Sequence, residues 1–158
     1  MIFKDIADLI KEEFIDVELD AEQEHIKVSN ADWLKVSKFL KDSETLRFDF
    51  LSCITSIDGG DEGFYVAYNL TSLRFKHHIE VRVFAEDMKV NSVQSLWRTA
   101  DWHEREAYDM MGALFSNHPD MRRILLSSDW EGYPLRKDYK EPDYYHGLPV
   151  PKDKSYWE

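Results

Sequence analysis

The sequence predicts an α+β fold, in which helices pack on an antiparallel or mixed sheet and a long extended arm follows at the C-terminus. Three observations support this prediction. Apolar residues recur at helical spacing in two segments before residue 42, and they alternate with polar residues in segments between residues 46 and 84. Beyond residue 115 they follow no regular period. Helices and a short strand that precede a run of strands are typical of α+β domains.

The first part of the chain contains two predicted helices and a strand. Residues 2–14 form an amphipathic helical pattern with an acidic polar face, which favours packing on the chain's own sheet over binding a partner or a membrane. A strand is predicted at His25–Val28. Ser29–Asn30 then serves as a cap for a helix from Asp32 to Lys41. The inner face of this helix carries Trp33, Val36 and Leu40.

Three longer strands are predicted at residues 46–57, 64–70 and 75–84. In the first strand the alternation shifts its phase near Leu51, which indicates a β-bulge or burial on both faces. The glycine-rich run at residues 59–63 predicts a hairpin turn. The side chains expected to face inward are Leu46, Phe48 and Phe50, then Phe64, Val66, Tyr68 and Leu70, and finally Phe75, His77, Ile79, Val81 and Val83.

The histidines and the single cysteine of these strands do not predict a metal or catalytic site. His77 and His78 are adjacent on a strand and point to opposite faces, so they cannot bind one metal ion together. The strand setting of Cys53 favours a small buried hydrophobe over a nucleophile.

The stretch from residue 102 to residue 139 opens with a short, highly charged helix. A helical turn is predicted before it at Val93–Trp97. Asp101 and Glu104 have the spacing of a capping box, and Gly112 is suited to end the helix.

Glu104 occupies an unusual position for a charged residue on this helix. Helical geometry places Glu104 within an apolar arc, and a carboxylate there must be paired or protonated. We expect it to pair with Arg122 or Arg123, with a solvated charge at a frayed helix end as the alternative. Arg105 and Asp109 have the spacing of an i, i+4 ion pair.

Residues 115–158 have the composition of an extended partner-binding arm that follows an α+β domain at residues 1–114. All five prolines of the chain lie beyond residue 118, together with many Trp, Tyr and Arg residues of the kind that anchor interfaces. A structureless loop of this length is uncommon inside a compact domain. We therefore expect the arm to lie on the surface of another protein rather than to form an independent domain.

Composition excludes several classes of function. The formal net charge of −11 argues against binding nucleic acid and against direct adsorption to anionic lipid. A single cysteine excludes an intrachain disulfide and cannot supply the four thiolates that an iron–sulfur cluster normally needs. The sequence shows no signal peptide and no long apolar run, so we expect a soluble intracellular protein.

No motif in the chain predicts an active site of its own. His103 and Glu104 resemble the start of the zinc-protease pattern HExxH, but residue 107 is Ala. Glu104 and Glu106 point about 200° apart on a helix by its geometry and cannot flank one bond. His118 is a lone histidine in a turn, and phosphate-binding loops are absent from the sequence. We expect no catalytic, cofactor-binding or metal-binding residues.

The same stretch resembles the C subunit of the proton-pumping NADH–quinone oxidoreductases (respiratory complex I). The family pattern begins with Glu-Arg-Glu and continues through an acid, two apolar residues, a histidine, a base and two further apolar residues. In this chain those positions are Glu104-Arg105-Glu106, Asp109, Met110-Met111, His118, Arg122 and Ile124-Leu125. Asp129-Trp130-Glu131-Gly132 and Pro134-Leu135-Arg136-Lys137-Asp138-Tyr139 also resemble the family, as do Ser95-Leu96-Trp97, Ala100 and Trp102. Ser127-Ser128 and Tyr133 depart from it.

The resemblance implies a structural or assembly role without redox chemistry in this chain. It implies that the chain docks on the D subunit of complex I, which helps to form the quinone site. The B and I subunits of complex I would lie close by. FMN and iron–sulfur clusters would reside on partner subunits, and quinone would not be bound directly. It also implies a peripheral position on the cytoplasmic side of the cell inner membrane, held there only through partners. The interface residues it implies are Glu104, Arg105, Glu106, Asp109, His118, Arg122, Arg123, Asp129, Trp130, Pro134, Arg136, Lys137, Asp138 and Tyr139.

Two alternatives stay open at this point. Related subunits resemble parts of membrane-bound hydrogenases and of quinone reductases fed by ferredoxin, and the electron donor is decided by other chains. An alternative of another class is a free-standing binding module.

Overall fold

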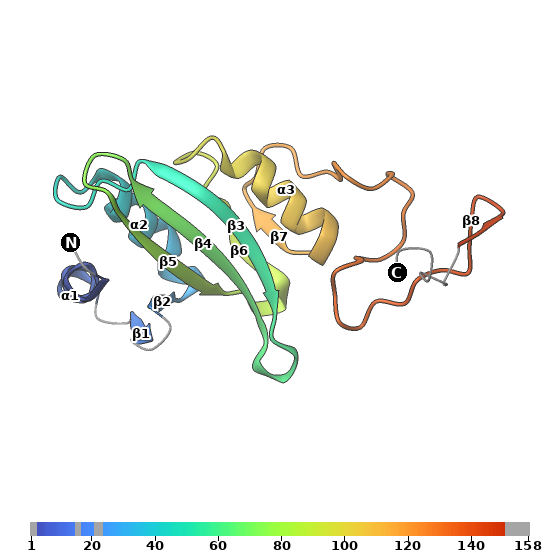
Figure 1. Cartoon of the computed structure of the whole chain (residues 1–158), viewed down its shortest axis with the longest axis horizontal. Coiled ribbons are helices and arrows are strands. Elements are labelled where there is room, and N and C mark those ends of the chain that lie inside the picture. The colour runs from blue at the N-terminus through green and yellow to red at the C-terminus, as the bar shows by residue number, and fades with distance from the viewer. Residues whose placement is uncertain (1–2, 15–16, 21–23, 151–158) are drawn as a thin grey trace, which may run out of the picture.

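The computed structural model describes residues 3–14, 17–20 and 24–150, and it confirms the predicted α+β architecture. Its centre is a five-stranded sheet with the strand order β1-β2-β5-β4-β3 (Figure 1). Strand β2 pairs in parallel with β5, and the other pairings in this sheet are antiparallel, so the sheet is mixed. The strands are β1 (Glu18–Asp20), β2 (His25–Val28), β3 (Phe50–Asp58), β4 (Phe64–Ser72) and β5 (His77–Phe84).

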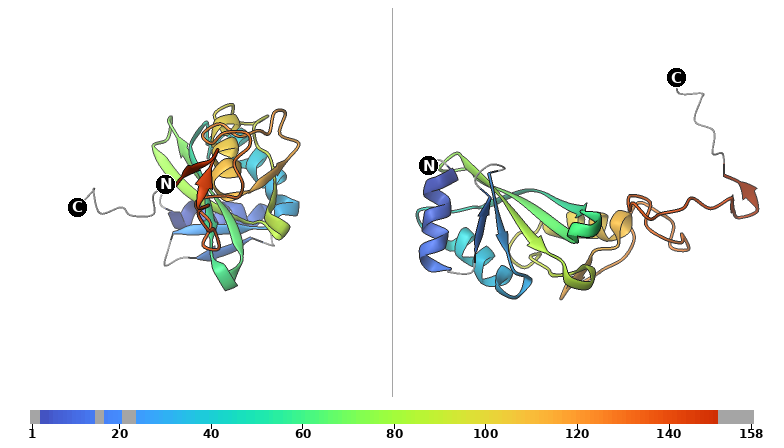
Figure 2. Two further views of the ribbon diagram at one scale, coloured as in Figure 1. Left: turned by 90° about the vertical axis from the view of Figure 1, so that its right-hand side faces the viewer. Right: turned by 90° about the horizontal axis from the view of Figure 1, so that it is seen from below.

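Three α-helices accompany the sheet in the described part of the chain: α1 (Phe3–Glu13), α2 (Asn30–Asp42) and α3 (Ala100–Met111). Helix α1 lies at the end of the molecule away from the C-terminal arm, whereas α3 lies beside the edge strand β3 (Figures 1 and 2). The helix predicted at residues 2–14 is confirmed within the described residues, and Ile2 lies outside them. Ser29 caps α2 by accepting a hydrogen bond from the Asp32 backbone N–H (3.2 Å), and Asn30 already belongs to the helix.

The hydrophobic core joins the sheet to helices α1 and α2. Trp33 of α2 and Tyr68 of β4 are fully buried, with ring centroids 4.4 Å apart. Ile6 and Ile10 bring α1 into the same core. The packing of the first helix on its own domain is thus confirmed, because burying the apolar stripe removes it from water.

The two adjacent histidines of β5 face opposite sides of the sheet, as predicted. The side chain of His77 is buried, and its Nε2 lies 2.7 Å from the Leu46 carbonyl oxygen. His78 is exposed.

The predicted start of the first long strand is wrong. Leu46 and Phe48 are buried as expected, but Arg47 has a φ of 43° and the Phe48 N–H bonds to the Leu40 carbonyl, so the chain still turns away from α2 there. Strand β3 begins at Phe50, whose side chain is 43% exposed instead of facing inward. The predicted bulge is confirmed by a register shift between Leu51 and Cys53.

Two smaller expectations for these strands are also wrong. Cys53 is only partly buried, and its Sγ lies 3.4 Å from Thr55 Oγ1, so it does not behave as a core hydrophobe. Phe75 precedes β5 and is 39% exposed, because the β4–β5 turn extends through Lys76, which has a φ of 55°. The hairpin turn between β3 and β4 is confirmed and contains the 3-10 turn η1 (Gly60–Glu62).

Several short elements connect the sheet to the arm. The predicted helical turn before α3 is present, with a hydrogen bond from the Trp97 N–H to the Val93 carbonyl (3.0 Å). The parallel pairing of β6 with β7 was not predicted, and β7 crosses the expected boundary after residue 114. The division into a domain at residues 1–114 and an arm at residues 115–158 therefore stays a prediction. These elements are the 3-10 turn η2 (Glu86–Met88), β6 (Lys89–Asn91), β7 (Leu114–Ser116), β8 (Tyr144–Tyr145) and β9 (Leu148–Pro149).

The chain after β7 runs as an extended arm away from the sheet and carries the small β8–β9 hairpin near its far end (Figure 2).

Candidate interaction site

Helix α3 forms the base from which the arm starts, and its ends only partly match the prediction. Gly112 ends the helix as predicted, with a left-handed φ of 80° and its N–H bonded to the Tyr108 carbonyl. The predicted capping box is wrong. Thr99 is the N-cap residue, but its hydroxyl donates to the Leu51 carbonyl instead of capping the helix, and Asp101 lies inside the helix. The carboxylates of Asp101 and Glu104 bind other residues instead of capping the helix.

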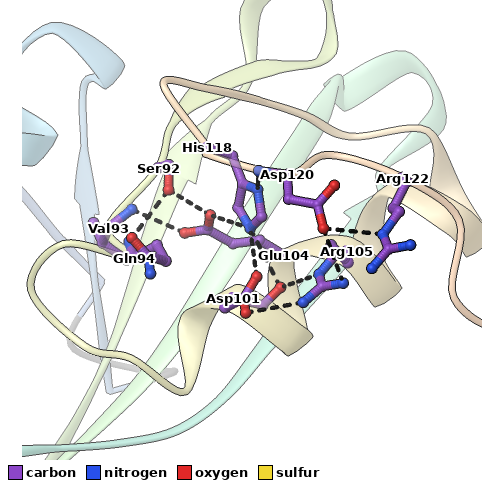
Figure 3. Close-up of polar contacts among 9 residues, drawn as sticks. All are labelled: Ser92, Val93, Gln94, Asp101, Glu104, Arg105, His118, Asp120 and Arg122. Atoms are coloured by element: carbon purple, nitrogen blue, oxygen red, sulfur yellow. Dashed lines mark hydrogen bonds and ion pairs between the residues drawn. The ribbon is translucent and has the colours of Figure 1, made fainter.

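Glu104 is fully buried and is held by residues that precede the helix (Figure 3). Its Oε2 accepts a hydrogen bond from the Ser92 hydroxyl (2.6 Å), and its Oε1 accepts one from the Val93 backbone N–H (2.8 Å). Burial raises the pKa of Glu104 to about 7, although these two hydrogen bonds act in the opposite direction. The carboxyl group therefore changes charge close to neutral pH.

The expected pairing of Glu104 with Arg122 or Arg123 is wrong, and so is the solvated alternative. Arg122 pairs with Asp120 and Arg123 pairs with Asp109. The physical reason is that the β6–β7 pairing, which continues in a hydrogen bond from the Ser92 N–H to the Ser116 carbonyl, already brings two donors over Glu104.

His118 is not a free histidine in a turn, because its side chain is completely buried against α3 (Figure 3). Its Nδ1 accepts a hydrogen bond from the Asp120 backbone N–H (3.1 Å), so the ring carries its proton on Nε2. That nitrogen lies 3.2 Å from Asp101 Oδ1 and 4.0 Å from Glu104 Oε2. The imidazole thus joins the start of the arm to two carboxylates of the helix.

Arg105 is the cation of this cluster, and its predicted pairing with Asp109 is wrong. The Arg105 guanidinium lies 2.9 Å from Asp101 Oδ2, one helical turn earlier, and 3.8 Å from Asp120 Oδ2 on the arm. It also lies over the Trp102 ring, 4.5 Å from the centroid. Glu106, by contrast, is exposed and points away from Glu104, as helical geometry requires.

Asp109 forms the second anchor of the arm. Its Oδ2 accepts hydrogen bonds from three successive backbone N–H groups, those of residues 124, 125 and 126, at 2.9, 2.6 and 3.0 Å. Its Oδ1 lies 2.8 Å from Arg123 Nη1. Burial alone would raise the pKa of Asp109, but the three N–H groups and Arg123 together hold that pKa below its ordinary value. An ionised carboxylate at the helix therefore fixes the backbone of the arm.

The arm then folds back onto the C-terminal end of α3. Arg123 bonds to the Gly132 carbonyl (2.9 Å), and its guanidinium lies 5.2 Å from the centre of the Tyr133 ring. The Leu135 N–H bonds to the Met110 carbonyl (3.0 Å). Tyr133 covers Gly112, where a β-carbon would lie 2.7 Å from the ring, so glycine is required there for the close approach. Pro134 lies between Tyr133 and Leu135.

A third contact joins the arm to the β3–β4 turn. Asp58 accepts hydrogen bonds from the backbone N–H groups of Lys137 (3.1 Å) and Gly60 (3.0 Å), which hold the pKa of this carboxyl below its ordinary value. Arg136 forms two hydrogen bonds to Asp138, both 2.9 Å, and its Nη1 lies 3.3 Å from the sulfur of Met88.

The other interface residues that the family resemblance implies lie farther along the arm. Asp129 accepts a hydrogen bond from the Tyr145 hydroxyl (3.1 Å), and Trp130 packs against the Tyr145 ring with centroids 5.0 Å apart. Tyr139 lies against Gly132 and lines an open cavity of about 370 Å³ with Arg136.

Sequence reasoning missed the roles of four residues that hold these groups: Asp58, Ser92, Asp101, which it placed in a capping box, and Tyr145. Asp58 directly precedes a Gly-Gly turn, a position where acids commonly accept backbone N–H groups, so a signal was present for it. The other three are recognisable only after the chain has folded back.

The described residues contain no group of three or more His, Cys, Asp or Glu side chains arranged to hold a metal ion. Within the same part of the chain, none of the helices has the length and apolar character needed to cross a membrane.

The family model of the 30 kDa subunit of respiratory-chain NADH dehydrogenase matches residues 26–145. The chain belongs to this family. Among its relatives, the C subunit of NADH-quinone oxidoreductase from Chloroherpeton thalassium is 48% identical over 151 residues, covering 90% of this chain and 63% of the relative. The corresponding protein of Chlorobium phaeobacteroides is 45% identical over 123 residues, covering 75% of this chain and 74% of the relative. The chain thus spans somewhat less than two thirds of the length of the first of these proteins.

Two solved structures share the fold of this 30 kDa-family chain. A trypsin-resistant fragment (1–134) of Nqo5 has a TM-score of 0.62 and 24% identity, covering 76% of this chain and 99% of the fragment. A chain of the membrane-bound sulfane sulfur reductase, an archaeal respiratory membrane complex, has a TM-score of 0.73 and 22% identity, covering 87% of this chain and 85% of its own length. The second likeness therefore extends to residues of this chain that the Nqo5 fragment does not cover.

Proposed function

We propose that the chain is a structural and assembly subunit, without redox chemistry of its own, in the peripheral arm of a proton-translocating NADH:quinone oxidoreductase. In this proposal it docks on the quinone-site D subunit, with the B and I subunits nearby. The observation that carries the proposal is the arm itself, because carboxylates of the domain anchor it while several of its large apolar side chains are exposed. These are Leu125 (61%), Leu135 (64%), Tyr144 (68%) and Leu148 (70%).

The anchoring of the root favours docking for a physical reason. Association loses affinity when a loop or side chain must be ordered at the interface. The contacts that Asp109, Asp101 and Asp58 make with the arm supply that order within the chain itself. Burial of the exposed apolar residues of the arm by a partner would then contribute directly to binding.

The enzyme assignment in this proposal is collective. The chain has one cysteine, which cannot supply the ligands of an iron–sulfur cluster, so FMN and iron–sulfur clusters are assigned to partner subunits. Quinone is assigned to the site of the D subunit and not to this chain. The chain would lie on the cytoplasmic side of the cell inner membrane and associate with the membrane only through its partners.

A second candidate function is the one that the sequence resemblance left open, an equivalent subunit of a membrane-bound hydrogenase or of a ferredoxin-fed quinone reductase. The likeness to a chain of the sulfane sulfur reductase complex, over 87% of this chain, concerns the fold and is compatible with either candidate. Neighbouring genes discriminate between them, because flavin-binding relatives of the E and F subunits indicate NADH, whereas nickel-ligand cysteines in the relative of the D subunit indicate a hydrogenase.

The test is affinity purification of the tagged chain from solubilised membranes, followed by mass spectrometry of the co-purifying proteins. We expect wild type to retain the D subunit and Arg136→Ala to lose most of it with an unchanged circular dichroism spectrum. The substitution removes the contacts to Asp138 and Met88 that hold this part of the arm in place. Arg98→Ala is the matched control, since Arg98 is exposed and lies outside the arm. Normal assembly and quinone reduction by Arg136→Ala would exclude this docking role.

A further inference from the structure

A small cavity near the far end of the arm has a chemistry that docking on an apolar surface does not explain. Its volume is about 260 Å³, which is below the roughly 300–1,000 Å³ typical of small-molecule sites and suits one long side chain. It lies where the β8–β9 hairpin returns to the preceding loop. It is lined by Asp129, Trp130, Glu131, Pro142, Tyr144, Tyr145 and His146.

Aromatic rings form the walls of this cavity and meet at steep angles. The rings of Trp130 and Tyr145 are inclined by 50°, and those of Tyr145 and His146 by 80°, with centroids 4.3 Å apart. Tyr144 is largely exposed at the rim. The Tyr145 and His146 rings pack edge to face and both line the cavity, and any ring face left open to it would attract a cation.

The permanently charged side chains that line the cavity are acidic, and His146 lies beside Asp129 as its ion-pair partner when protonated. Asp129 and Glu131 line it, and no Lys or Arg is among its lining residues in the described part of the chain. Hydrogen bonds from Ser127, together with those from its own backbone and from Tyr145, hold the pKa of Asp129 below its ordinary value, so this carboxylate stays ionised. The neighbouring cavity shares Glu131 but is lined by Arg136 and Lys140, so the two cavities differ in the charge they present.

The cavity is shaped by contacts within the chain. The Tyr145 hydroxyl donates to Asp129 Oδ1, and His146 Nε2 lies 2.8 Å from Asp129 Oδ2. The Val150 N–H bonds to the Asp143 carbonyl (2.9 Å) and closes the hairpin. A site that is already shaped needs little reorganisation when it binds.

We propose that this cavity binds the ammonium or guanidinium group of a Lys or Arg side chain that projects from the partner protein. The inference rests on the proposed function, because the partner is the protein on which the arm docks. It adds the chemistry of one contact, in which ring faces and two carboxylates surround a cation.

The first experiment tests the chemistry on the full chain alone. N-acetyl-arginine amide and N-acetyl-lysine amide are titrated while the Trp130 indole N–H is followed by NMR, with N-acetyl-norleucine amide as the neutral control. We expect saturable shifts with a dissociation constant on the order of 10 mM for the cationic amides and none for norleucine amide. Equal shifts with all three compounds, or no shift at all, would overturn the proposal.

The second experiment measures the affinity of the full chain for the purified relative of the D subunit. Trp130→Leu and Glu131→Gln are expected to weaken binding about tenfold each, whereas Glu44→Gln, an exposed acid outside the arm, leaves it unchanged. Glu131→Gln changes only an exposed residue, so it tests the idea even if Trp130→Leu disturbs the hairpin.

The two ideas fail separately. Wild-type affinity in both variants would overturn the cation site while docking stands. Absence of any binding by wild type, together with saturable binding of the arginine amide, would overturn docking on the D subunit while the cation chemistry of the cavity stands.

Discussion

Glu104 is a residue whose charge state couples to the stability of the fold. Its pKa is about 7 in the folded chain against an ordinary value of 4.5, so between these pH values the folded state keeps a proton that the unfolded state has released. The contribution of Glu104 to the free energy of unfolding is therefore greatest below pH 4.5 and falls as the pH rises toward 7. Each pKa unit corresponds to about 1.4 kcal/mol, so the full effect is on the order of 3 kcal/mol.

Glu104→Gln should remove this dependence, because an amide resembles the protonated acid and does not ionise. The free energy of unfolding, measured by urea denaturation between about pH 5 and pH 8, is expected to decline less steeply for the variant than for wild type. Glu106→Gln, at an exposed position two residues away, should keep the wild-type slope. Parallel pH profiles for Glu104→Gln and wild type would contradict the assignment.

At the residue scale, the sequence indicated which side chains matter but not which of them pair. The i, i+4 rule directed Arg105 to Asp109, but the structure pairs Arg105 with Asp101 and leaves Asp109 to the arm. Pairing rules for an isolated helix consider only its own surface. The arm covers that surface with backbone N–H groups, which compete successfully for a buried carboxylate.

At the scale of elements, periodicity was a good guide wherever an element buries one face. The pattern predicted β2 with its observed bounds and predicted α2, β4 and β5 within a few residues. It could not show the parallel pairing of β2 with β5, since the partner of a strand depends on contacts distant in sequence. Strands β6 and β7 have three residues each, too few for a recognisable alternation.

The C-terminus of α3 gives a prediction at this scale. Gly112→Ala should destabilise the chain, because φ at this position is 80° and the new β-carbon would meet the Tyr133 ring at 2.7 Å. Left-handed backbone costs an ordinary residue about 1–2 kcal/mol, and overpacking adds about 1–3 kcal/mol.

Gly60→Ala separates the two contributions to that loss. Its φ is also positive, at 63°, but the nearest atom is the flexible end of Lys137 at 3.7 Å. Chemical denaturation should therefore show a smaller loss for Gly60→Ala than for Gly112→Ala. Equal losses would mean that the contact with Tyr133 does not restrict this position.

At the scale of the whole molecule, an acidic α+β domain holds an arm of different character. Residues 112–140 contain five basic and four acidic residues in a chain whose net charge is −11. Composition was enough to predict the arm, because its prolines and aromatic residues fit neither a core nor a disordered tail.

The attachment of the arm could not be predicted, because the carboxylates that hold it bond to backbone groups distant in sequence. Asp58 lies 79 residues before Lys137, and Asp109 lies 15, 16 and 17 residues before its three N–H partners.

The Asp109 anchor should decide how readily the arm detaches from the domain. Asp109→Asn removes the charge that binds Arg123 and three backbone N–H groups, and it places an amide donor where only acceptors are needed. A loss of about 3 kcal/mol in local stability corresponds to a roughly 100-fold larger open population. Trypsin cleavage after Arg122 or Arg123, followed by mass spectrometry under native conditions, should accelerate by a comparable factor while the domain stays folded by near-ultraviolet circular dichroism. Glu141→Gln, which removes the charge of an exposed acid farther along the arm, should be cleaved at nearly the wild-type rate. Equal rates for wild type and Asp109→Asn would show that the arm is held mainly by its other contacts, those of His118 and Asp58.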